Sequence, residues 1–292
     1  DQSDHVQSAG LVVKQYVRRP SSYLSKKSLG DYLVEQGVPG IERVDTRKLV
    51  MIIRDEGAMR GGIFMGVYND EMLAKVRSIP VMTGLDLTDA VTTKKAYTFG
   101  NIQNKRYQVA VLDFGVKRAI LKRLDEIGFG VHVFPAKTSI DEIKDFDCFV
   151  LSNGPGDPEV LHTPIQTTKA LLESGKPVFG ICLGHQLLGL AYQRETQKLK
   201  YGHHGSNQGV RDSRTGNVEF TAQNHGFVVN TDNTVDQLDT VFTNLNDQTI
   251  EGFVDKSVPV MSSQHHPEAS PGPHDSAHLF SDFYRMVEKF YS

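Results

Sequence analysis

The segment Gly180-Ile-Cys182-Leu-Gly184-His-Gln places one cysteine between two glycines, directly after an apolar run. A sharp turn from a buried strand into a helix is the setting in which G-x-S-x-G enzymes expose a nucleophilic serine, and a thiolate can take that place. The glycines avoid side-chain clashes in such a turn. The helix N-terminus favours the thiolate and offers N–H groups to an oxyanion. The alternative is a buried structural cysteine, and the flanking glycines favour the nucleophile.

A thiol nucleophile needs a base, and the segment His265-His266-Pro-Glu268 offers one. The proline holds His266 in an extended conformation, in which residues two apart share a side, so Glu268 can orient the His266 imidazole. His265 then points to the opposite side. Paired histidines can also form a metal site, but no carboxylate or cysteine stands at ligand spacing here, so we predict no metal.

The remaining candidates have weaker support. Cys148 lies inside an apolar run, DCFVL, and is predicted to be structural. His185 is next to the nucleophile but on a helix, and is also predicted to be structural. His203 and His204 are ambiguous, and we assign them to a loop. The short segments SNGPGDP and NHGF read as turns that could bind a ligand, although each signal is weak alone.

The elements that must position these residues alternate from residue 108 onward. VAVLDF, GVHVFP, DCFVLS and PVFGI read as buried strands, with helical patterns between them. This alternation predicts an α/β fold with a mostly parallel central sheet flanked by helices. After about residue 197 the pieces become short and strand-like, and a last amphipathic helix spans roughly 276–290. In open sheets, sites lie at the carboxyl ends of the strands, where Cys182 and His266 stand.

Residues 1–91 differ in character and predict a smaller α+β domain. They mix short extended pieces with two helical patterns. In the second pattern, DTRKLVMIIRDEG, Asp45 is a plausible N-cap and Gly57 supplies the stop. Residues 92–107 are polar and aperiodic and read as a linker. The second domain then covers residues 108–292.

Composition excludes several classes of protein. The chain has 292 residues, 39% of them hydrophobic, and a formal charge of −3, so it can build a core but has no basic excess to bind nucleic acid. Two cysteines fit a reducing compartment. The apolar runs are too short for a membrane span, and the first residues lack the layout of a signal peptide, so we predict a cytoplasmic protein without membrane contact. Neither G-x-x-x-x-G-K-[ST] nor G-x-G-x-x-G is present.

Taken together, GICLGHQ, SNGPGDP, AQNHGF and HPEASPGPHD resemble the class I (triad) glutamine amidotransferase family. Within it, VDTRKL and the long HPEASPGPHD motif resemble the small, glutaminase subunits of carbamoyl-phosphate synthetases, over nearly the whole chain. The resemblance implies that Cys182 attacks the amide of glutamine, that His266 is the base and that Glu268 orients it. It also implies contacts to glutamine or the oxyanion from Gly154, Gly156, Leu183, Gln186, Asn224, Gly226 and Phe227.

The same resemblance implies a heterodimer with a large synthetase subunit. That partner takes ammonia and uses ATP, Mg and bicarbonate to make carbamoyl phosphate for arginine and pyrimidine biosynthesis, so no cofactor is expected on this chain. Small subunits of the family begin with a further segment, including a serine that contacts glutamine, so the first domain is expected to be incomplete.

Two alternatives to this reading remain. One is the glutaminase subunit of another amidotransferase, such as anthranilate synthase. The first domain and the HPEASPGPHD motif argue against it. The other is a non-catalytic regulatory subunit with a relic site. The presence of Cys182, His266 and Glu268 together argues against that one.

Overall fold

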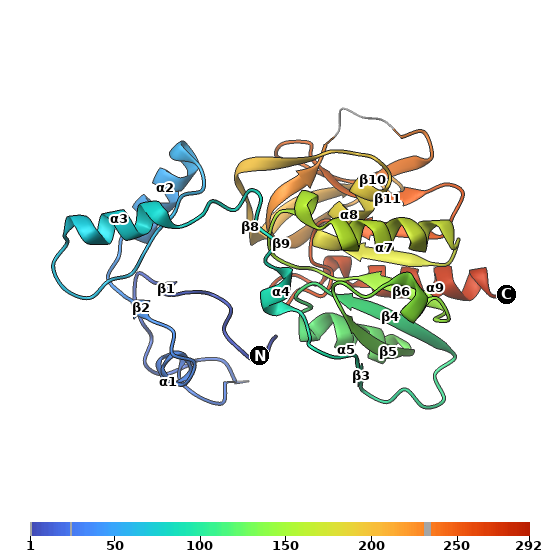
Figure 1. Cartoon of the computed structure of the whole chain (residues 1–292), viewed down its shortest axis with the longest axis horizontal. Coiled ribbons are helices and arrows are strands. Elements are labelled where there is room, and N and C mark those ends of the chain that lie inside the picture. The colour runs from blue at the N-terminus through green and yellow to red at the C-terminus, as the bar shows by residue number, and fades with distance from the viewer. Residues whose placement is uncertain (1, 24, 231–234) are drawn as a thin grey trace. The chain divides into compact units, whose positions relative to one another are not determined.

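A computed structural model describes the chain over residues 2–23, 25–230 and 235–292. It divides into two compact units, one of residues 3–81 and one of residues 82–292 together with Gln2 (Figure 1). The second unit therefore begins before residue 92. It does so because Thr88 is fully buried in it, and because the N–H of Gly84 donates to the carboxylate of Asp157 at 2.8 Å.

The first unit contains short strands and three helices among its described residues. The two strands pair in parallel. As predicted, Asp45 caps one helix, with its side chain accepting a hydrogen bond from the N–H of Lys48, and Gly57 ends it at a φ of 95°. The elements are β1 (Leu11–Val12), α1 (Leu29–Glu35), β2 (Gly40–Ile41), α2 (Thr46–Glu56) and α3 (Asp70–Ser78).

The second unit is built on one sheet, which has ten strands within the described residues, in the order β3-β5-β4-β6-β7-β12-β11-β10-β8-β9. The five strands from β5 to β12 run parallel, and the others pair antiparallel. The strands are β3 (Tyr97–Phe99), β4 (Tyr107–Asp113), β5 (Phe129–Pro135), β6 (Cys148–Leu151), β7 (Val178–Ile181), β8 (Thr196–Asp212), β9 (Val218–Val229), β10 (Leu238–Asn244), β11 (Ile250–Asp255) and β12 (Val260–Ser263).

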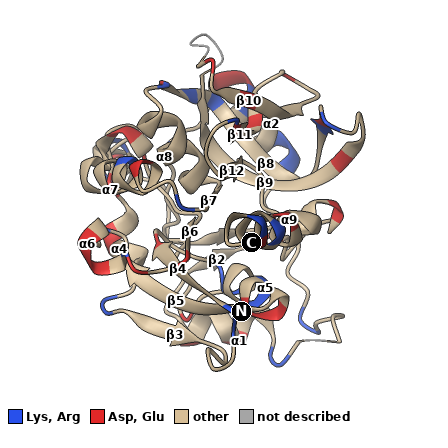
Figure 2. Ribbon diagram, turned by 90° about the vertical axis from the view of Figure 1, so that its right-hand side faces the viewer, with Lys and Arg blue, Asp and Glu red and all other residues tan. Residues whose placement is uncertain are grey.

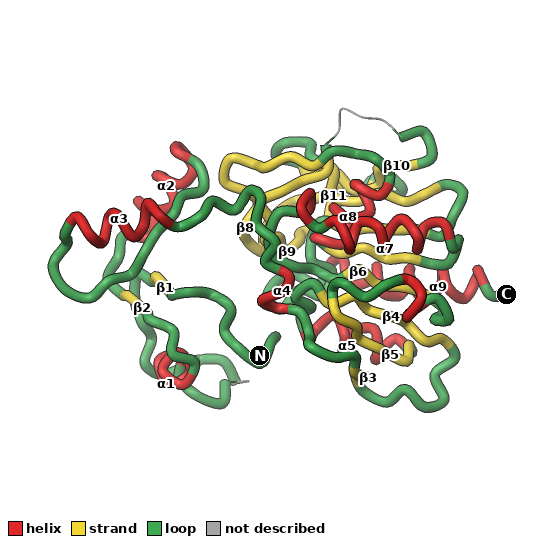
Figure 3. The backbone as a smooth tube through the Cα atoms, in the orientation of Figure 1, coloured by secondary structure: helices red, strands yellow, loops and turns green. Residues whose placement is uncertain are grey.

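Helices cover both faces of this sheet, which confirms the predicted α/β fold (Figures 1 and 3). Apolar side chains of α5 and α9 pack in one core, and those of α6, α7 and α8 in the other. The helical elements are α4 (Thr88–Val91), α5 (Arg118–Ile127), α6 (Ile140–Ile143), the 3₁₀ turn η1 (Pro158–Val160), α7 (His162–Glu173), α8 (Leu183–Ala191), the 3₁₀ turn η2 (Asp275–Ala277) and α9 (His278–Phe290).

Two stretches differ from the sequence predictions. The segment 92–107, read as a linker, contains the edge strand β3, whose three residues are too few to show an alternating pattern. His203 and His204 lie in strand β8 and not in a loop. Glycines and polar residues in β8 obscure the strand pattern there, and the pairing with β9 is interrupted by register shifts.

The surface charge is mixed. Helices α5, α7 and α9 each carry side chains of both signs (Figure 2). In the parts of the chain that the structure describes, no helix combines the length and apolar character needed to cross a membrane.

Candidate active site

Cys182 stands at the junction of strand β7 and helix α8, as the glycine-flanked motif predicts. Its φ of 53° and ψ of −99° place a non-glycine residue in a strained backbone conformation. Its N–H donates to the carbonyl of Ser263 at 2.7 Å, which ties the elbow to the end of the neighbouring strand β12. The side chain is 3% exposed.

The two glycines of the motif permit close backbone packing. A Cβ on Gly184 would lie 2.1 Å from the carbonyl oxygen of Leu151, and one on Gly180 would lie 2.6 Å from the carbonyl oxygen of Gly184. Neither contact can relax by moving a flexible side chain. The elbow therefore requires glycine at both positions.

His266 bridges the thiol and a carboxylate. Its Nδ1 lies 2.7 Å from Oε1 of Glu268, and the thiol of Cys182 lies close enough to the ring to affect its protonation. Burial alone would lower the pKa of His266, but the Glu268 charge and the contact with Cys182 raise it to about 9. The geometry thus favours an imidazolium beside the sulfur.

Glu268 is held by a second cation that the sequence analysis did not single out. Lys117 Nζ lies 3.0 Å from Glu268 Oε1, and the carboxylate is fully buried. Burial raises the pKa of Glu268, but His266 and Lys117 outweigh burial and hold it below the usual value. Lys117 follows strand β4, so the rule that sites lie at the carboxyl ends of strands could have indicated it.

The loop after β6 lies against the start of helix α8. A Cβ on Gly154 would lie 2.3 Å from the carbonyl oxygen of Phe114 and 2.7 Å from Cδ2 of Leu183. Gly156 has a φ of 102°, a value that suits glycine, and a Cβ there would lie 2.8 Å from the carbonyl oxygen of Leu85. Close packing against backbone atoms therefore requires glycine at both Gly154 and Gly156. Gly154 also lies next to Leu183.

The segment Asn224–Phe227 belongs to strand β9 and is not the turn expected from its sequence. Its polar residues pair across the sheet, since Asn224 Oδ1 lies 2.7 Å from Nδ1 of His204 on β8. Gln186 on α8 reaches the same strand, with its Nε2 donating to the Phe227 carbonyl at 2.8 Å. The helix that follows Cys182 is thereby joined to the strand that carries Asn224, Gly226 and Phe227.

Two residues predicted to be structural lie in the core. Cys148 is fully buried in β6, and burial raises the pKa of its thiol well above the ordinary value. His185 is also fully buried, with its Nδ1 2.9 Å from the Ser262 hydroxyl, and burial lowers its pKa to about 3. At neutral pH the Cys148 thiol therefore stays protonated, and the His185 imidazole does not hold the second proton that an acid would need.

Comparisons with known proteins show the family to which the chain belongs. Residues 110–286 match the family model for class I glutamine amidotransferases, and residues 1–63 match that for the CPSase domain of the carbamoyl-phosphate synthase small chain. The carbamoyl phosphate synthase small chain of Synechocystis sp. is 43% identical over 308 residues, covering 99% of this chain and 79% of that protein. This chain belongs to the carbamoyl phosphate synthase small chain family.

Other relatives agree with the assignment. The carbamoyl phosphate synthase small chain of Streptomyces coelicolor is 44% identical over 300 residues, covering 98% of this chain and 78% of that protein. Among solved structures, a putative GMP synthase protein from Thermoplasma acidophilum superposes with a TM-score of 0.57 at 19% identity, covering 63% of this chain and 96% of that one. At that identity the likeness shows the fold alone.

Proposed function

We propose that this chain is the glutaminase subunit of a carbamoyl phosphate synthase and hydrolyses L-glutamine at Cys182. The observation that carries the proposal is that His266 hydrogen-bonds to Glu268 and interacts electrostatically with Cys182, which stands at a strained strand–helix elbow. A nucleophile, a base and an orienting carboxylate in contact are the parts of a catalytic triad.

In the proposed reaction, the Cys182 thiolate adds to the side-chain amide carbon of glutamine. Backbone N–H groups of Gly156 and Leu183 stabilise the oxyanion. The His266 imidazolium gives its proton to the departing nitrogen, so ammonia leaves and a glutamyl thioester remains. Neutral His266 then takes a proton from water, which attacks the thioester, releases glutamate and restores the thiolate and the imidazolium.

Glutamine binding is assigned to residues around this centre. The packing of Gly154 against Leu183 and the hydrogen bond from Gln186 to Phe227 support a single site that joins the loop after β6, helix α8 and strand β9. The proposed contacts to glutamine or the oxyanion are Gly154, Gly156, Leu183, Gln186, Asn224, Gly226 and Phe227.

The ammonia would pass to a large subunit that consumes ATP with Mg and bicarbonate in arginine and pyrimidine biosynthesis. This chain has no phosphate-cradling motif of its own, so ATP is assigned to the partner. The match of residues 1–63 to the CPSase domain model favours this acceptor over that of an anthranilate synthase.

Helix α2 of the first unit is the proposed docking surface for the large subunit. It exposes three apolar side chains, those of Val50, Met51 and Ile52, by 63%, 47% and 39%, which supports this role.

Mixing with the large subunit tests the proposal. Because free ammonia would be wasted, we expect the isolated chain to hydrolyse glutamine slowly. The large subunit with ATP and bicarbonate should accelerate hydrolysis at least tenfold, which corresponds to a change of about 1.4 kcal/mol in the free-energy difference between an inactive and an active conformation. Carbamoyl phosphate should form from glutamine in the mixture. With Cys182→Ala in place of the parent chain, carbamoyl phosphate should form only when ammonium is added. An unchanged glutaminase rate and no carbamoyl phosphate would contradict the proposal.

The pKa shift of His266 predicts the alkaline limb of the pH profile. The imidazolium is the acid that protonates ammonia, so kcat/KM should fall as pH rises through about 9, where His266 loses its proton. Glu268→Gln removes the charge that raises this pKa, so the limb should move to lower pH. Lys117→Met removes a cation that partly neutralises Glu268, so the alkaline limb should not shift to lower pH.

Glutaminase assays of the parent and these variants across the alkaline range measure the shift. Lys122→Met is the matched control, because Lys122 lies on helix α5, which Lys117 precedes, and is exposed and paired only with Glu126 among the ion pairs of the described residues. Its profile should equal that of the parent chain. A Glu268→Gln limb at the parent position would show that the carboxylate does not set the protonation of His266.

A further inference from the structure

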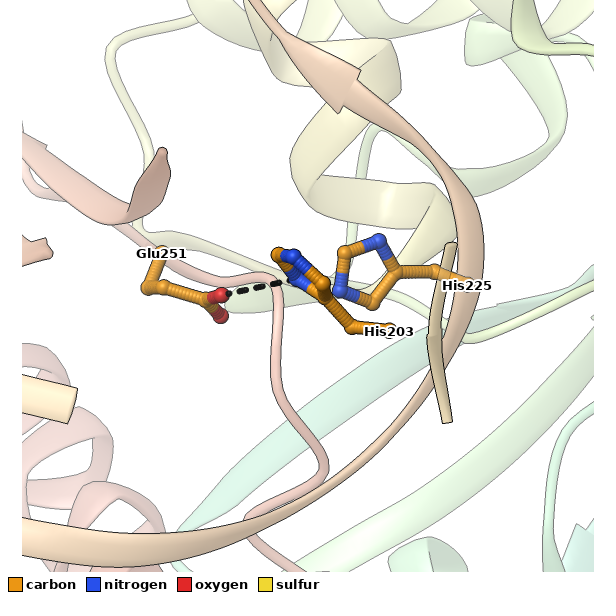
Figure 4. A group of neighbouring side chains, drawn as sticks. All are labelled: His203, His225 and Glu251. Atoms are coloured by element: carbon orange, nitrogen blue, oxygen red, sulfur yellow. Dashed lines mark ion pairs between the residues drawn. The ribbon is translucent and has the colours of Figure 1, made fainter. Parts of the chain in front are cut away.

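A buried cluster of metal-ligating side chains lies outside the proposed triad. His203 on β8, His225 on β9 and Glu251 on β11 bring one ligand atom each within 4.8 Å of one another (Figure 4). The three residues, here called the His–Glu cluster, are 8%, 5% and 0% exposed. Glu251 comes from a strand distant in the sequence from both histidines, so spacing along the chain could not have indicated it.

The outer partners of the two histidines fix which nitrogen is available. Nε2 of His203 lies 2.8 Å from a carboxylate oxygen of Asp247, so the proton of a neutral ring sits there and Nδ1 carries the lone pair. Nδ1 of His225 donates to the Phe227 carbonyl at 2.9 Å, so its Nε2 carries the lone pair. A carboxylate or carbonyl on the far nitrogen is the outer arrangement that metal-binding histidines usually have.

Each residue of the cluster has a polar atom that faces no hydrogen-bond donor. His203 Nδ1 is buried without a hydrogen bond and faces Glu251 Oε1 at 3.5 Å, one acceptor opposite another. His225 Nε2 faces Oε1 of Gln223, again an acceptor, at 3.2 Å. Glu251 Oε2 is buried and unpaired as well, and lies 3.9 Å from Nδ1 of His265. The other oxygen, Oε1, accepts a hydrogen bond from Asn244 Nδ2 at 2.9 Å. Buried polar atoms without partners are costly, and a cation would satisfy His203 Nδ1 and Glu251 Oε2.

We propose that the His–Glu cluster binds a divalent transition metal of the zinc class through His203 Nδ1, His225 Nε2 and the Glu251 carboxylate. Two imidazoles and a carboxylate are a ligand set that suits zinc, with a water completing four-coordination. Tetrahedral ligands about 2.0–2.2 Å from zinc lie roughly 3.3–3.6 Å apart, so the side chains draw together on binding. The metal would join β8, β9 and β11 and so brace the strand that carries the proposed glutamine contacts.

The rival arrangement has no metal and a doubly protonated His203, whose Nδ1–H points at Glu251 and whose Nε2–H donates to Asp247. A titration with metal distinguishes the two arrangements. We would strip the full chain with a chelator and add Zn²⁺ alone, measuring bound metal per chain and Tm. The proposal expects one equivalent and a higher Tm. No bound metal would overturn it in favour of the proton.

Variants locate the site. His203→Gln and the nearly isosteric Glu251→Gln should each lose the bound equivalent and the rise in Tm. Asp247→Asn, which changes only the outer partner, should weaken binding about 10–100-fold. Zinc could also bind at the active-site thiol. Cys182→Ser excludes that site, so this variant should retain the metal if the His–Glu cluster binds it. His278→Gln is the matched surface control, since His278 also lies between two carboxylates, those of Glu219 and Asp282.

Co²⁺ as a probe reports the ligand types independently of stability. The bound ion should give the visible ligand-field bands of a four-coordinate nitrogen–oxygen site without a thiolate charge-transfer band. A thiolate band, retention of the metal by Glu251→Gln, or its loss in Cys182→Ser would overturn the assignment.

Discussion

Replacing Cys182 by alanine should lower glutamine hydrolysis by a factor on the order of 10³ or more, because no other group described near His266 can form the acyl intermediate. Glutamine should still bind, since the proposed contacts to it do not require the sulfur. Steady-state glutaminase assays and calorimetric titration with glutamine measure the two effects.

Cys148 provides the control within the same chain. It is fully buried in the sheet, and its thiol has a raised pKa, so Cys148→Ala should retain hydrolysis. A glutamine-mimicking alkylator should label Cys182 and spare Cys148, as peptide mapping would show. Label concentrated on Cys148, or hydrolysis retained without Cys182, would refute the assignment of the nucleophile.

Loss of the proposed base, His266, should be almost as severe. His266→Gln removes both the acid that releases ammonia and the base that activates water, so we expect a loss comparable to that of Cys182→Ala. Glu268→Gln keeps the shape of the side chain and removes only its charge, so its loss should be smaller. In a serine protease triad, removal of the orienting carboxylate costs roughly 10²-fold less than removal of the base.

Parallel kcat/KM measurements on the two variants, with thermal unfolding as a check on folding, decide between these roles. If Glu268→Gln were as inactive as His266→Gln while equally stable, Glu268 would take a more direct part in the chemistry than orienting the imidazole.

The sequence was sufficient wherever the structure of the candidate site rests on a local pattern. The glycines around Cys182 predicted the strand–helix elbow, and the proline after His266 predicted that this residue and Glu268 share a side. Asp45 and Gly57 predicted the ends of α2, because capping is a property of single residues at fixed offsets.

Long-range pairing is what the sequence could not provide. Lys117 reaches Glu268 from a segment about 150 residues earlier, and that contact depends on β4 and β12 ending at the same edge of the sheet. The hairpin of β8 and β9 was missed because its pairing shifts register, so no period of two extends along it. Glu251 could not be predicted for the same reason as Lys117, since it comes to the histidines from β11, which β10 separates from β8 in the sheet.

Trapping the acyl intermediate tests the central claim, that Cys182 carries the glutamyl group under the control of His266. The full chain, with its large subunit present, would be mixed with isotopically labelled glutamine, quenched in acid within the first turnovers and digested for mass spectrometry. We predict label on the peptide that contains Cys182, as a hydroxylamine-sensitive thioester, and none on that peptide in Cys182→Ala. Turnover of glutamine with no covalent label at Cys182 would contradict the account.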